Sequence, residues 1–225
     1  MCSKIKFEPM KRIFYTIFGW LMIIAAAQAQ GNKQDFEGII TYRLIIEAKN
    51  PMLNTRNLQA MFGDTMRLYL KENNYKMAFT GTYAREILYT GDENKHYITL
   101  GPIDSLVWRY CNEHASSAIY TSSTENAGYI MDYKCNSYAI QTDWGLTTYY
   151  YSPQLKLDPK KYKQHIFNYF NVYVQYAQAP YLKYVYSGPS FKLTLVAVDI
   201  QKQQIERTAF HAKWSPVSTA DNITK

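Results

Sequence analysis

DFEGIITYRLIIEA, residues 35–48, alternates along its whole length between side chains of two kinds. Apolar, aromatic or small residues occupy the even positions from 36 to 48, and most of the odd positions carry charged or hydroxyl side chains. A period of two indicates a β-strand with one buried face, because a helix repeats every ~3.6 residues. The stretch therefore predicts a long strand at the start of the folded part of the chain.

The same alternation recurs through the rest of the sequence, interrupted by short polar turns. Two pairs of runs flank turns rich in Asn and Gly, a pattern typical of β-hairpins. The first pair is 66–71 and 75–79, and the second is 85–89 and 95–100. Further predicted strands are 105–111, 118–122, 133–140, 146–151, 182–186, 191–200 and 204–210.

Helical patterns are scarce. A short helix is predicted at 57–62, where Gly63 would end it. Asp158 and Pro159 are suited to a helix start, and the aromatic spacing that follows predicts a helix over 159–170. Residues 171–176 (NVYVQY) nevertheless alternate like a strand, so the sequence does not decide whether segment 158–180 is a helix or a strand.

About ten short strands with at most two helices, and no alternating strand–helix units, argue against a parallel sheet. We expect a mainly β protein: a single large curved antiparallel sheet, with one or two short covering helices. The chain contains 22 tyrosines. Tyrosine favours strands and suits half-buried surfaces where its hydroxyl stays in water.

The first 29 residues differ from the rest. Lys11 and Arg12 precede an apolar run, 13–27, and Ala27-Gln28-Ala29 provides a small-x-small cleavage pattern. These are the three parts of a secretory signal peptide, whereas a membrane anchor needs about 20 apolar residues. We expect a signal peptide over 1–29, a single β-rich domain over 30–225, and a periplasmic or secreted protein with no transmembrane segment after cleavage.

The net charge and the number of cysteines narrow the class of protein that the sequence can encode. Without residues 1–29 the chain keeps 21 basic and 17 acidic residues, a net charge of +4, scattered along the sequence. Nucleic-acid binding would require a concentrated basic stripe, so it is not expected. Cys111 and Cys135 remain after cleavage, and an even pair in an exported domain predicts a disulfide; two buried free thiols are the alternative.

No motif for catalysis or for metal or cofactor binding stands out. The four histidines (96, 114, 165 and 211) lack the spacing of a metal site, and each is expected at the surface or half-buried. No nucleophile elbow, phosphate loop or dinucleotide fingerprint is present. We therefore expect a non-catalytic protein without a cofactor, while a hydrolase with catalytic groups on separate strands stays open.

Several strands are apolar on both faces. In the first strand Ile39 and Ile45 oppose Ile40, Leu44 and Ile46, and residues 191–200 show the same arrangement. Such strands need covers on both sides, and the predicted helices are few. Either loops and closure of the sheet cover the remaining apolar surface, or part of that surface lines a cavity for an apolar ligand.

Four segments carry a family resemblance: FEGIITYRL (36–44), MRLYLKENNYKMAF (66–79), MDYKCNSYAI (131–140) and TTYYYSPQL (147–155). Together they resemble small secreted Bacteroidetes proteins, the GLPGLI-type group and relatives of unknown function. These proteins are thought to share the half-barrel fold of the LolA/LolB and LppX superfamily. The chain departs from that pattern by lacking a Gly-Leu-Pro-Gly-Leu-Ile segment and by having Asp132 where glycine is usual.

The resemblance implies a half-barrel with helices at its mouth, and non-catalytic binding of a lipid, an acyl chain or a lipoprotein. The ligand-binding residues it suggests are apolar and on strands: Tyr42, Leu44, Leu68, Met77, Phe79 and Leu195. The alternative is a protein of a different class, a structural or protein-interaction module of the cell envelope or exterior, with exposed tyrosines as its contact surface.

Overall fold

The structure is a computed structural model that describes residues 35–101, 105–211 and 218–219. The expected signal peptide at 1–29 lies outside the described residues. Within the described part of the chain, no helix has both the length and the apolar character needed to cross a membrane.

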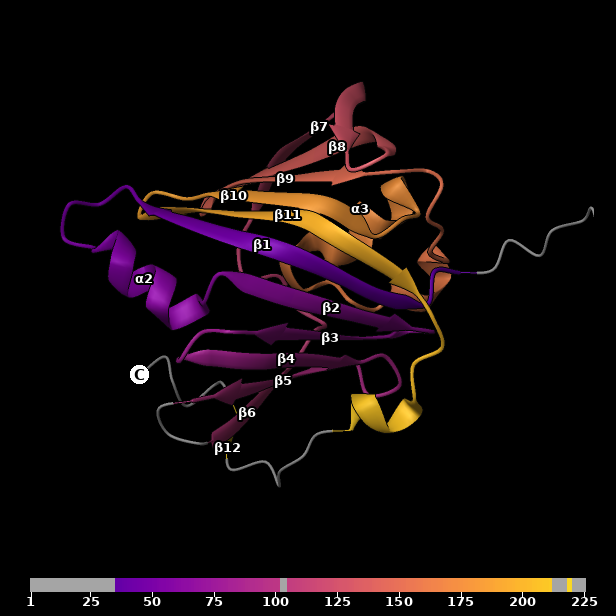
Figure 1. The fold of residues 1–225 in the computed structure, drawn as a ribbon, viewed down its shortest axis with the longest axis horizontal. Coiled ribbons are helices and arrows are strands. Elements are labelled where there is room, and N and C mark those ends of the chain that lie inside the picture. Colours follow the sequence, from indigo (N-terminus) through magenta and orange to yellow (C-terminus); the bar gives the residue numbers. More distant parts are fainter. Residues whose placement is uncertain (1–34, 102–104, 212–217, 220–225) are drawn as a thin grey trace, which may run out of the picture. The chain divides into compact units, whose positions relative to one another are not determined.

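Eleven antiparallel strands form one open sheet, which confirms the predicted fold class (Figure 1). A two-residue strand, β12 (Ser218–Thr219), adds to its edge by pairing parallel with β6. The eleven are β1 (Gly38–Ala48), β2 (Thr65–Lys71), β3 (Asn74–Phe79), β4 (Ala84–Thr90), β5 (Lys95–Leu100), β6 (Ser105–Tyr110), β7 (Ala118–Ile130), β8 (Tyr133–Thr142), β9 (Gly145–Tyr151), β10 (Tyr181–Ser187) and β11 (Phe191–Lys202).

The sheet consists of two meanders. Strands β1–β6 follow one another in space as in sequence, and so do β7–β11. The meanders join where β1 pairs with β11, so the order is β6-β5-β4-β3-β2-β1-β11-β10-β9-β8-β7. Consecutive antiparallel strands with short turns account for every hairpin that the sequence predicts.

The sheet must curl strongly, because β6 and β7 lie at opposite ends of this order yet are consecutive in the chain. Ten strand spacings in a flat sheet would separate them by about 48 Å. The connection, residues 111–117, reaches at most about 29 Å when fully extended. The two ends of the sheet are therefore drawn together, and the connection crosses the open side of the curve.

The alternation in β1 places its apolar face inside, as predicted. Ile40, Tyr42, Leu44 and Ile46 are each at most 2% exposed, whereas Arg43, Ile45 and Glu47 are exposed. The larger core cluster, to which these four residues belong, extends across both meanders. Because the α-helix at 170–177 also packs into that cluster, we call its side of the sheet the concave face.

A β-bulge in β11 places Ile200 on the opposite face of the sheet from the one that the sequence predicts. Thr41 pairs with Asp199 but Tyr42 pairs with Ala197, so Val198 is the extra residue of β11. An extra residue exchanges the faces of the residues beyond it. Ile200 consequently pairs with the buried Ile40 and packs on the concave-face core, although strict alternation placed it with Val198 on the other face.

Residues 204–210, predicted as a strand, instead cover the outer face of the sheet. A 3-10 turn, η3 (Arg207–Phe210), follows an irregular stretch. Ile205 and Phe210 pack in a smaller apolar cluster against the outward side chains of β4–β6: Leu88, Tyr97 and Leu106. The side chains of Ile205 and Phe210, five residues apart, anchor this segment to the sheet. A strand would instead need a continuous ladder of backbone hydrogen bonds.

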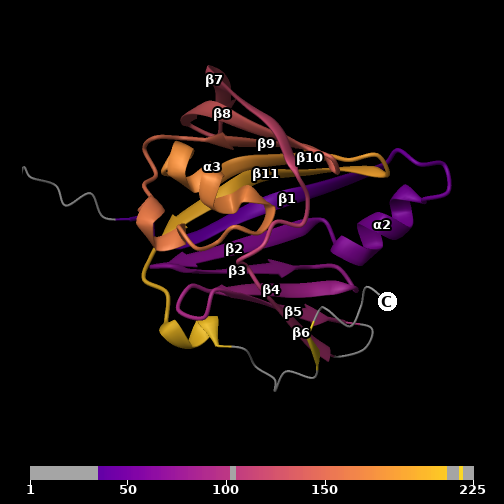
Figure 2. The ribbon, with the colours of Figure 1, turned by 180° about the vertical axis from the view of Figure 1, so that it is seen from behind.

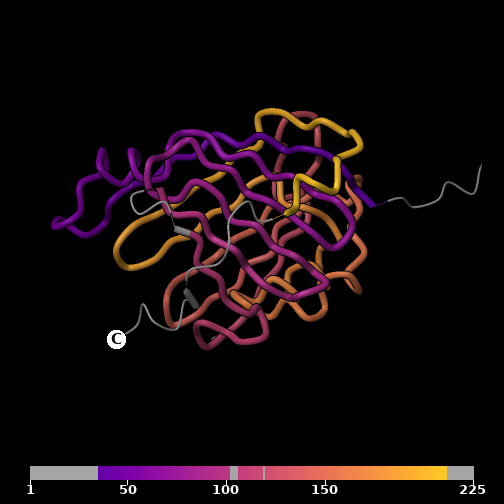
Figure 3. The backbone as a smooth tube through the Cα atoms, turned by 90° about the horizontal axis from the view of Figure 1, so that it is seen from below, coloured from indigo at the N-terminus to yellow at the C-terminus, as the bar shows by residue number. Residues whose placement is uncertain are grey.

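The short helix predicted at 57–62 is confirmed as α2 (Thr55–Phe62), which lies at one end of the strands, to the left in Figures 1 and 3. Asn54 caps it by accepting bonds from the backbone N–H groups of Arg56 and Asn57. Gly63 ends it at a φ of 80°, in the region that favours glycine.

The helix predicted at 159–170 is wrong in its bounds. Pro159–Tyr162 (η1) and Phe167–Tyr169 (η2) are 3-10 turns, and the α-helix, α3, is Phe170–Ala177, where the alternation resembled a strand. Asn168 and Tyr169 adopt left-handed backbone angles that separate the turn from the helix. Helix α3 lies behind the sheet in Figure 1 and in front of it in Figure 2, so it covers the concave face.

Tyrosines fill the core more deeply than expected. Tyr42, Tyr89, Tyr162 and Tyr173 are at most 1% exposed. Burial is possible because the hydroxyls find partners inside: Tyr42 donates to the Tyr181 carbonyl, Tyr173 donates to that of Ala179, and Tyr162 donates to that of Glu72. A buried phenol with a main-chain acceptor avoids the cost of an unsatisfied hydroxyl.

Candidate functional site

A cavity of about 450 Å³, partly open to solvent, lies on the concave face between the sheet and the segment around η2 and α3. Most of its lining is apolar or aromatic. The sheet contributes Tyr75, Met77, Phe79, Ile87, His96, Ile98, Arg109, Tyr149, Tyr181, Tyr184, Leu193 and Leu195, and the other segments contribute Phe62, Trp144, His165, Phe167, Asn168 and Phe170.

A second hollow of about 280 Å³ continues the first toward β8, β9 and β10. Six residues line both hollows: Phe62, Trp144, Tyr149, Asn168, Tyr184 and Leu193. The cavity is therefore elongated. One end carries Tyr75, His96, Arg109 and His165, whereas the other end is mainly aromatic and aliphatic.

The cover of the cavity is tied to the connection that crosses the open side of the sheet. The backbone N–H groups of Ile166 and Phe167 donate to the Cys111 carbonyl at 2.7 and 3.1 Å. The Tyr169 hydroxyl donates to the Ser116 carbonyl at 2.8 Å. These bonds hold 165–170 against 111–117, so both segments form one lid over the concave face.

Three polar side chains meet at one end of the cavity. The Tyr75 hydroxyl lies 2.6 Å from His96 Nε2 and 2.7 Å from His165 Nε2, and the two Nε2 atoms are 3.2 Å apart. A phenol has one proton, so it donates to only one ring. The other imidazole satisfies the network by carrying its own proton at Nε2 and donating.

Burial keeps both imidazoles neutral. His96 is 6% exposed and His165 is 1% exposed. Loss of solvation lowers the pKa of His165 to about 3. It also lowers the pKa of His96 well below its ordinary value, and the neighbouring His165 and Arg109 act in the same direction. Both rings consequently present neutral nitrogen atoms at physiological pH.

Arg109 brings a charge to the same end of the cavity. Its guanidinium lies 4.1 Å from the centre of the Phe167 ring, and its buried Nε has no hydrogen-bond partner. None of the ion pairs among the described residues involves it. Loss of solvation lowers the Arg109 pKa, and the nearby ionisable groups are the Cys111 thiol and the Tyr75 phenol. In the part of the chain that the structure describes, the Arg109 guanidinium at this cavity therefore has no ion-pair partner.

The predicted disulfide is wrong. Cys111 and Cys135 are both buried free thiols. Cys111 directly follows β6 and belongs to the crossing connection, whereas Cys135 lies within β8 beside the opposite edge of the sheet. Their partners differ accordingly, because the Cys135 thiol donates to the Tyr133 carbonyl, whereas Cys111 joins His96 and His165. Burial raises the Cys111 pKa to about 12, so the thiol is protonated.

The structure divides the six residues predicted to bind ligand into two groups. Met77, Phe79 and Leu195 line the cavity. Tyr42, Leu44 and Leu68 are buried in the concave-face core and are absent from the lining. All six lie on the same side of the sheet, but a cavity borders only part of that side.

Sequence reasoning missed the polar residues of the cavity. His96 could have been found, because on β5 it shares its face with Ile98, one period of two away. Arg109 pairs with His96 across β5 and β6 and so shares that face. His165 lies in an irregular segment between η1 and η2, where no periodicity indicates its direction.

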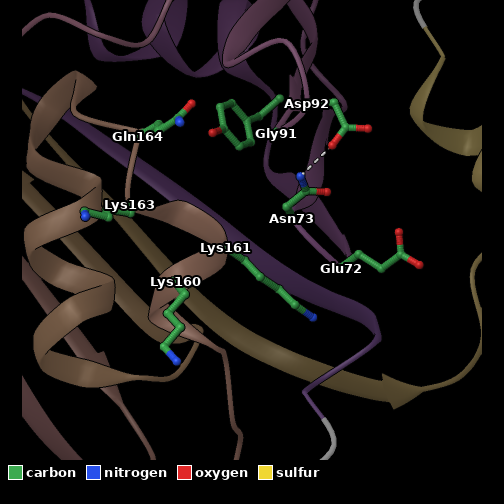
Figure 4. Close-up of a pocket in the computed structure, with 9 residues that line it drawn as sticks. Glu72, Asn73, Gly91, Asp92, Lys160, Lys161, Lys163 and Gln164 are labelled. Carbon is green, nitrogen blue, oxygen red and sulfur yellow. Dashed lines mark hydrogen bonds between the residues drawn. The ribbon is translucent and has the colours of Figure 1, made fainter.

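A third hollow, of about 730 Å³, is open and polar (Figure 4). Lysines and acidic residues face each other across it. Lys161 already pairs with Asp35 at 2.6 Å, and Glu72 pairs with Arg207 at 2.9 Å. Mixed and partly paired surface charges provide little specific affinity. Its labelled residues are Glu72, Asn73, Gly91, Asp92, Lys160, Lys161, Lys163 and Gln164.

Two sequence comparisons were without a match. No model of a known protein family matches the chain, and no curated protein matches its sequence. The chemistry that the concave face can support therefore follows from its own geometry. It combines apolar enclosure, one unpaired cation, two neutral imidazoles and a thiol.

Proposed function

We propose that this protein binds an amphipathic ligand whose apolar chain fills the concave cavity and whose acidic head group pairs with Arg109. The observation that carries the proposal is an apolar cavity of about 450 Å³ that contains an unpaired guanidinium. Cavities that hold small ligands measure about 300–1,000 Å³.

The shape and lining of the cavity favour an acyl chain. Aliphatic side chains such as Met77, Ile98 and Leu195 line the larger hollow, and the second hollow continues past Trp144 and Tyr184. Burying an apolar chain there contributes about 0.8 kcal/mol for each methylene removed from water. The elongated, mainly apolar lining suits a chain better than a compact polar metabolite.

The charge at the polar end favours an acid. A guanidinium in an apolar surrounding has lost hydration, and a carboxylate or phosphate oxygen restores it through bidentate hydrogen bonds. Arg109 is held in place by stacking on Phe167, which lowers the entropy lost on binding. The neighbouring Tyr75 hydroxyl adds a polar group to the same end.

The resemblance to half-barrel lipid carriers and the sequence of residues 1–29 support the same proposal. The ligand class would then be a lipid or the acyl chain of a lipoprotein, bound without catalysis in the periplasm or outside the cell. A shared fold does not fix a ligand, so the resemblance supports the class of ligand alone.

The proposal is tested by native mass spectrometry of protein purified without detergent, followed by organic extraction and lipid analysis. Titration with a fluorescent fatty acid then measures affinity in four variants. Arg109→Met removes the cation, and Arg67→Met removes an exposed arginine from the other face of β2. Met77→Trp fills the cavity, and Val198→Trp adds the same bulk at the exposed bulge.

A stoichiometric acyl adduct is expected. Removal of the Arg109 charge should weaken fatty-acid binding by roughly 10- to 100-fold, the loss of one charge-assisted contact of about 1.5–3 kcal/mol. Met77→Trp should abolish binding, whereas both control variants should bind as the unmodified protein does. A clean mass that envelope lipids leave unchanged would refute the proposal and favour the protein-interaction module.

A further inference from the structure

The polar end of the cavity holds a second arrangement, independent of any acyl ligand. One ring nitrogen of His96, one ring nitrogen of His165 and the Cys111 sulfur lie within 4.8 Å of one another, and all three residues are buried. They come from three separate segments: β5, the connection after β6, and the stretch between η1 and η2. Within the described residues they form the one group of three such ligands close enough to share an ion.

The distances are close to those of a metal centre. Metal–nitrogen bonds of about 2.0–2.1 Å and metal–sulfur bonds of about 2.3 Å place neighbouring ligand atoms roughly 3.5 Å apart. The two Nε2 atoms are 3.2 Å apart, and the Cys111 sulfur is within 4.8 Å of a ring nitrogen of each histidine. The three ligand atoms therefore lie near the spacing that one shared ion requires.

Main-chain hydrogen bonds already hold the three segments together. The Cys111 N–H donates to the Asn94 carbonyl at 2.9 Å, two residues before His96. The Cys111 carbonyl accepts from Ile166 at 2.7 Å, one residue after His165. The ligand positions are thus fixed by the fold before any ion binds, as a preorganised site requires.

Charge selects among the metals that accept nitrogen and sulfur. The site supplies one anionic ligand, the thiolate, and no carboxylate belongs to the group. Arg109 lies close enough to interact electrostatically with both His96 and Cys111. A divalent ion would leave a net positive charge beside that guanidinium in an apolar surrounding, at a high cost. A monovalent ion forms a neutral complex with one thiolate and two imidazoles.

We propose that His96, His165 and Cys111 bind copper(I) in a three-coordinate site at the end of the cavity. Soft sulfur ligands favour this ion. When the copper–sulfur bond forms, the thiol gives its proton to solvent and copper keeps its oxidation state. The Tyr75 hydroxyl, a hard oxygen, gives up its hydrogen bond to the imidazole and takes no part in coordination. Each ring binds through a nitrogen without a proton, so an imidazole whose proton lies on the ligating nitrogen moves it to its other ring nitrogen and stays neutral.

Anaerobic titration of the purified protein with copper(I), in competition with the chromophoric chelator bicinchoninate, tests this site. One ion per chain is expected, and X-ray absorption of the unmodified protein should show two nitrogens and one sulfur around copper. Cys111→Ser and His165→Gln should each weaken copper(I) binding by roughly 100-fold or more. Cys135→Ser, which removes the other buried thiol, should change nothing.

Tyr75→Phe separates this proposal from a hard-metal site that uses the phenol, because its copper(I) affinity should stay at least at the level of the unmodified protein. Three results would overturn the proposal: no binding against the chelator, equal loss in Cys135→Ser and Cys111→Ser, or tighter binding of zinc(II) than of copper(I). The absorption measurement needs no variant, so it holds even where a substitution prevents folding.

Discussion

Lowering the pH from 7 to 5 should destabilise the metal-free protein through His96 and His165. Both are neutral in the folded state because burial lowers their pKa, to about 3 for His165 and well below the ordinary value for His96. In the unfolded chain each titrates near a pKa of about 6.5. Below that pH the unfolded state binds more protons, so the free energy of unfolding falls as the pH falls.

The size of the effect follows from those values. With an unfolded pKa of about 6.5 and a folded pKa of about 3, His165 alone lowers the free energy of unfolding by about 2 kcal/mol between pH 7 and pH 5. His96, whose pKa burial also lowers, adds a loss of the same sign, and the total is a large part of the 5–15 kcal/mol typical of a domain. Carboxylates with lowered pKa, such as Glu37 and Glu93, lose their contribution below about pH 4.5. The change in stability between pH 7 and pH 5 therefore reports the titration of the histidines rather than that of these carboxylates.

Urea denaturation followed by circular dichroism at each pH measures the change. His165→Gln should reduce the loss between pH 7 and pH 5 by about 2 kcal/mol, because the titration of His165 is removed. His114→Gln, which removes an exposed histidine, is the matched control. A loss below about 1 kcal/mol in the unmodified protein would show that the two imidazoles are not buried and neutral, and would refute the reasoning.

Three further outcomes are expected. Gly63→Ala should lower the free energy of unfolding by about 2 kcal/mol, since φ is 80° and an added Cβ would meet backbone atoms at 2.4 Å; chemical denaturation measures this. Tyr42→Phe should cost about 1 kcal/mol through loss of the bond to the Tyr181 carbonyl, while fatty-acid affinity stays unchanged because Tyr42 is core rather than lining. Cys111 and Cys135 should both be alkylated by iodoacetamide after denaturation without reductant, and mass spectrometry would detect both labels. A protein mass without added label would instead show that the two cysteines form a disulfide.

The strands were predictable because their side-chain period is visible along the sequence. Residues 36–48 alternate with a period of two, and burial follows that alternation along β1. In β11 it places Leu195 and Ala197 in the core and leaves Val198 exposed at the bulge. The bulge itself has no signal in the sequence, because it depends on the pairing of β11 with β1. A local pattern cannot report a register set by a distant partner.

Segment 158–180 shows a related limit. Tyr173, Val174 and Ala177 are buried at helical spacing, but the aromatic residues around them alternate as well. Packing against the concave face decides between the two patterns, since the Tyr173 ring stacks on that of Tyr149 at 4.0 Å. His165 and Cys111 meet through the fold of the lid alone, so no spacing in the sequence indicates their proximity.

The pairing of β1 with β11 also governs how the molecule forms. Each meander can assemble from contacts between neighbouring segments, which form quickly, whereas this one ladder joins residues 38–48 to residues 191–202 and forms slowly. Until the chain is complete to that point, the apolar edges of both meanders are unpaired and prone to association. The cavity takes Met77 from one meander and Leu195 from the other. We therefore expect the cavity to be among the last parts of the protein to form.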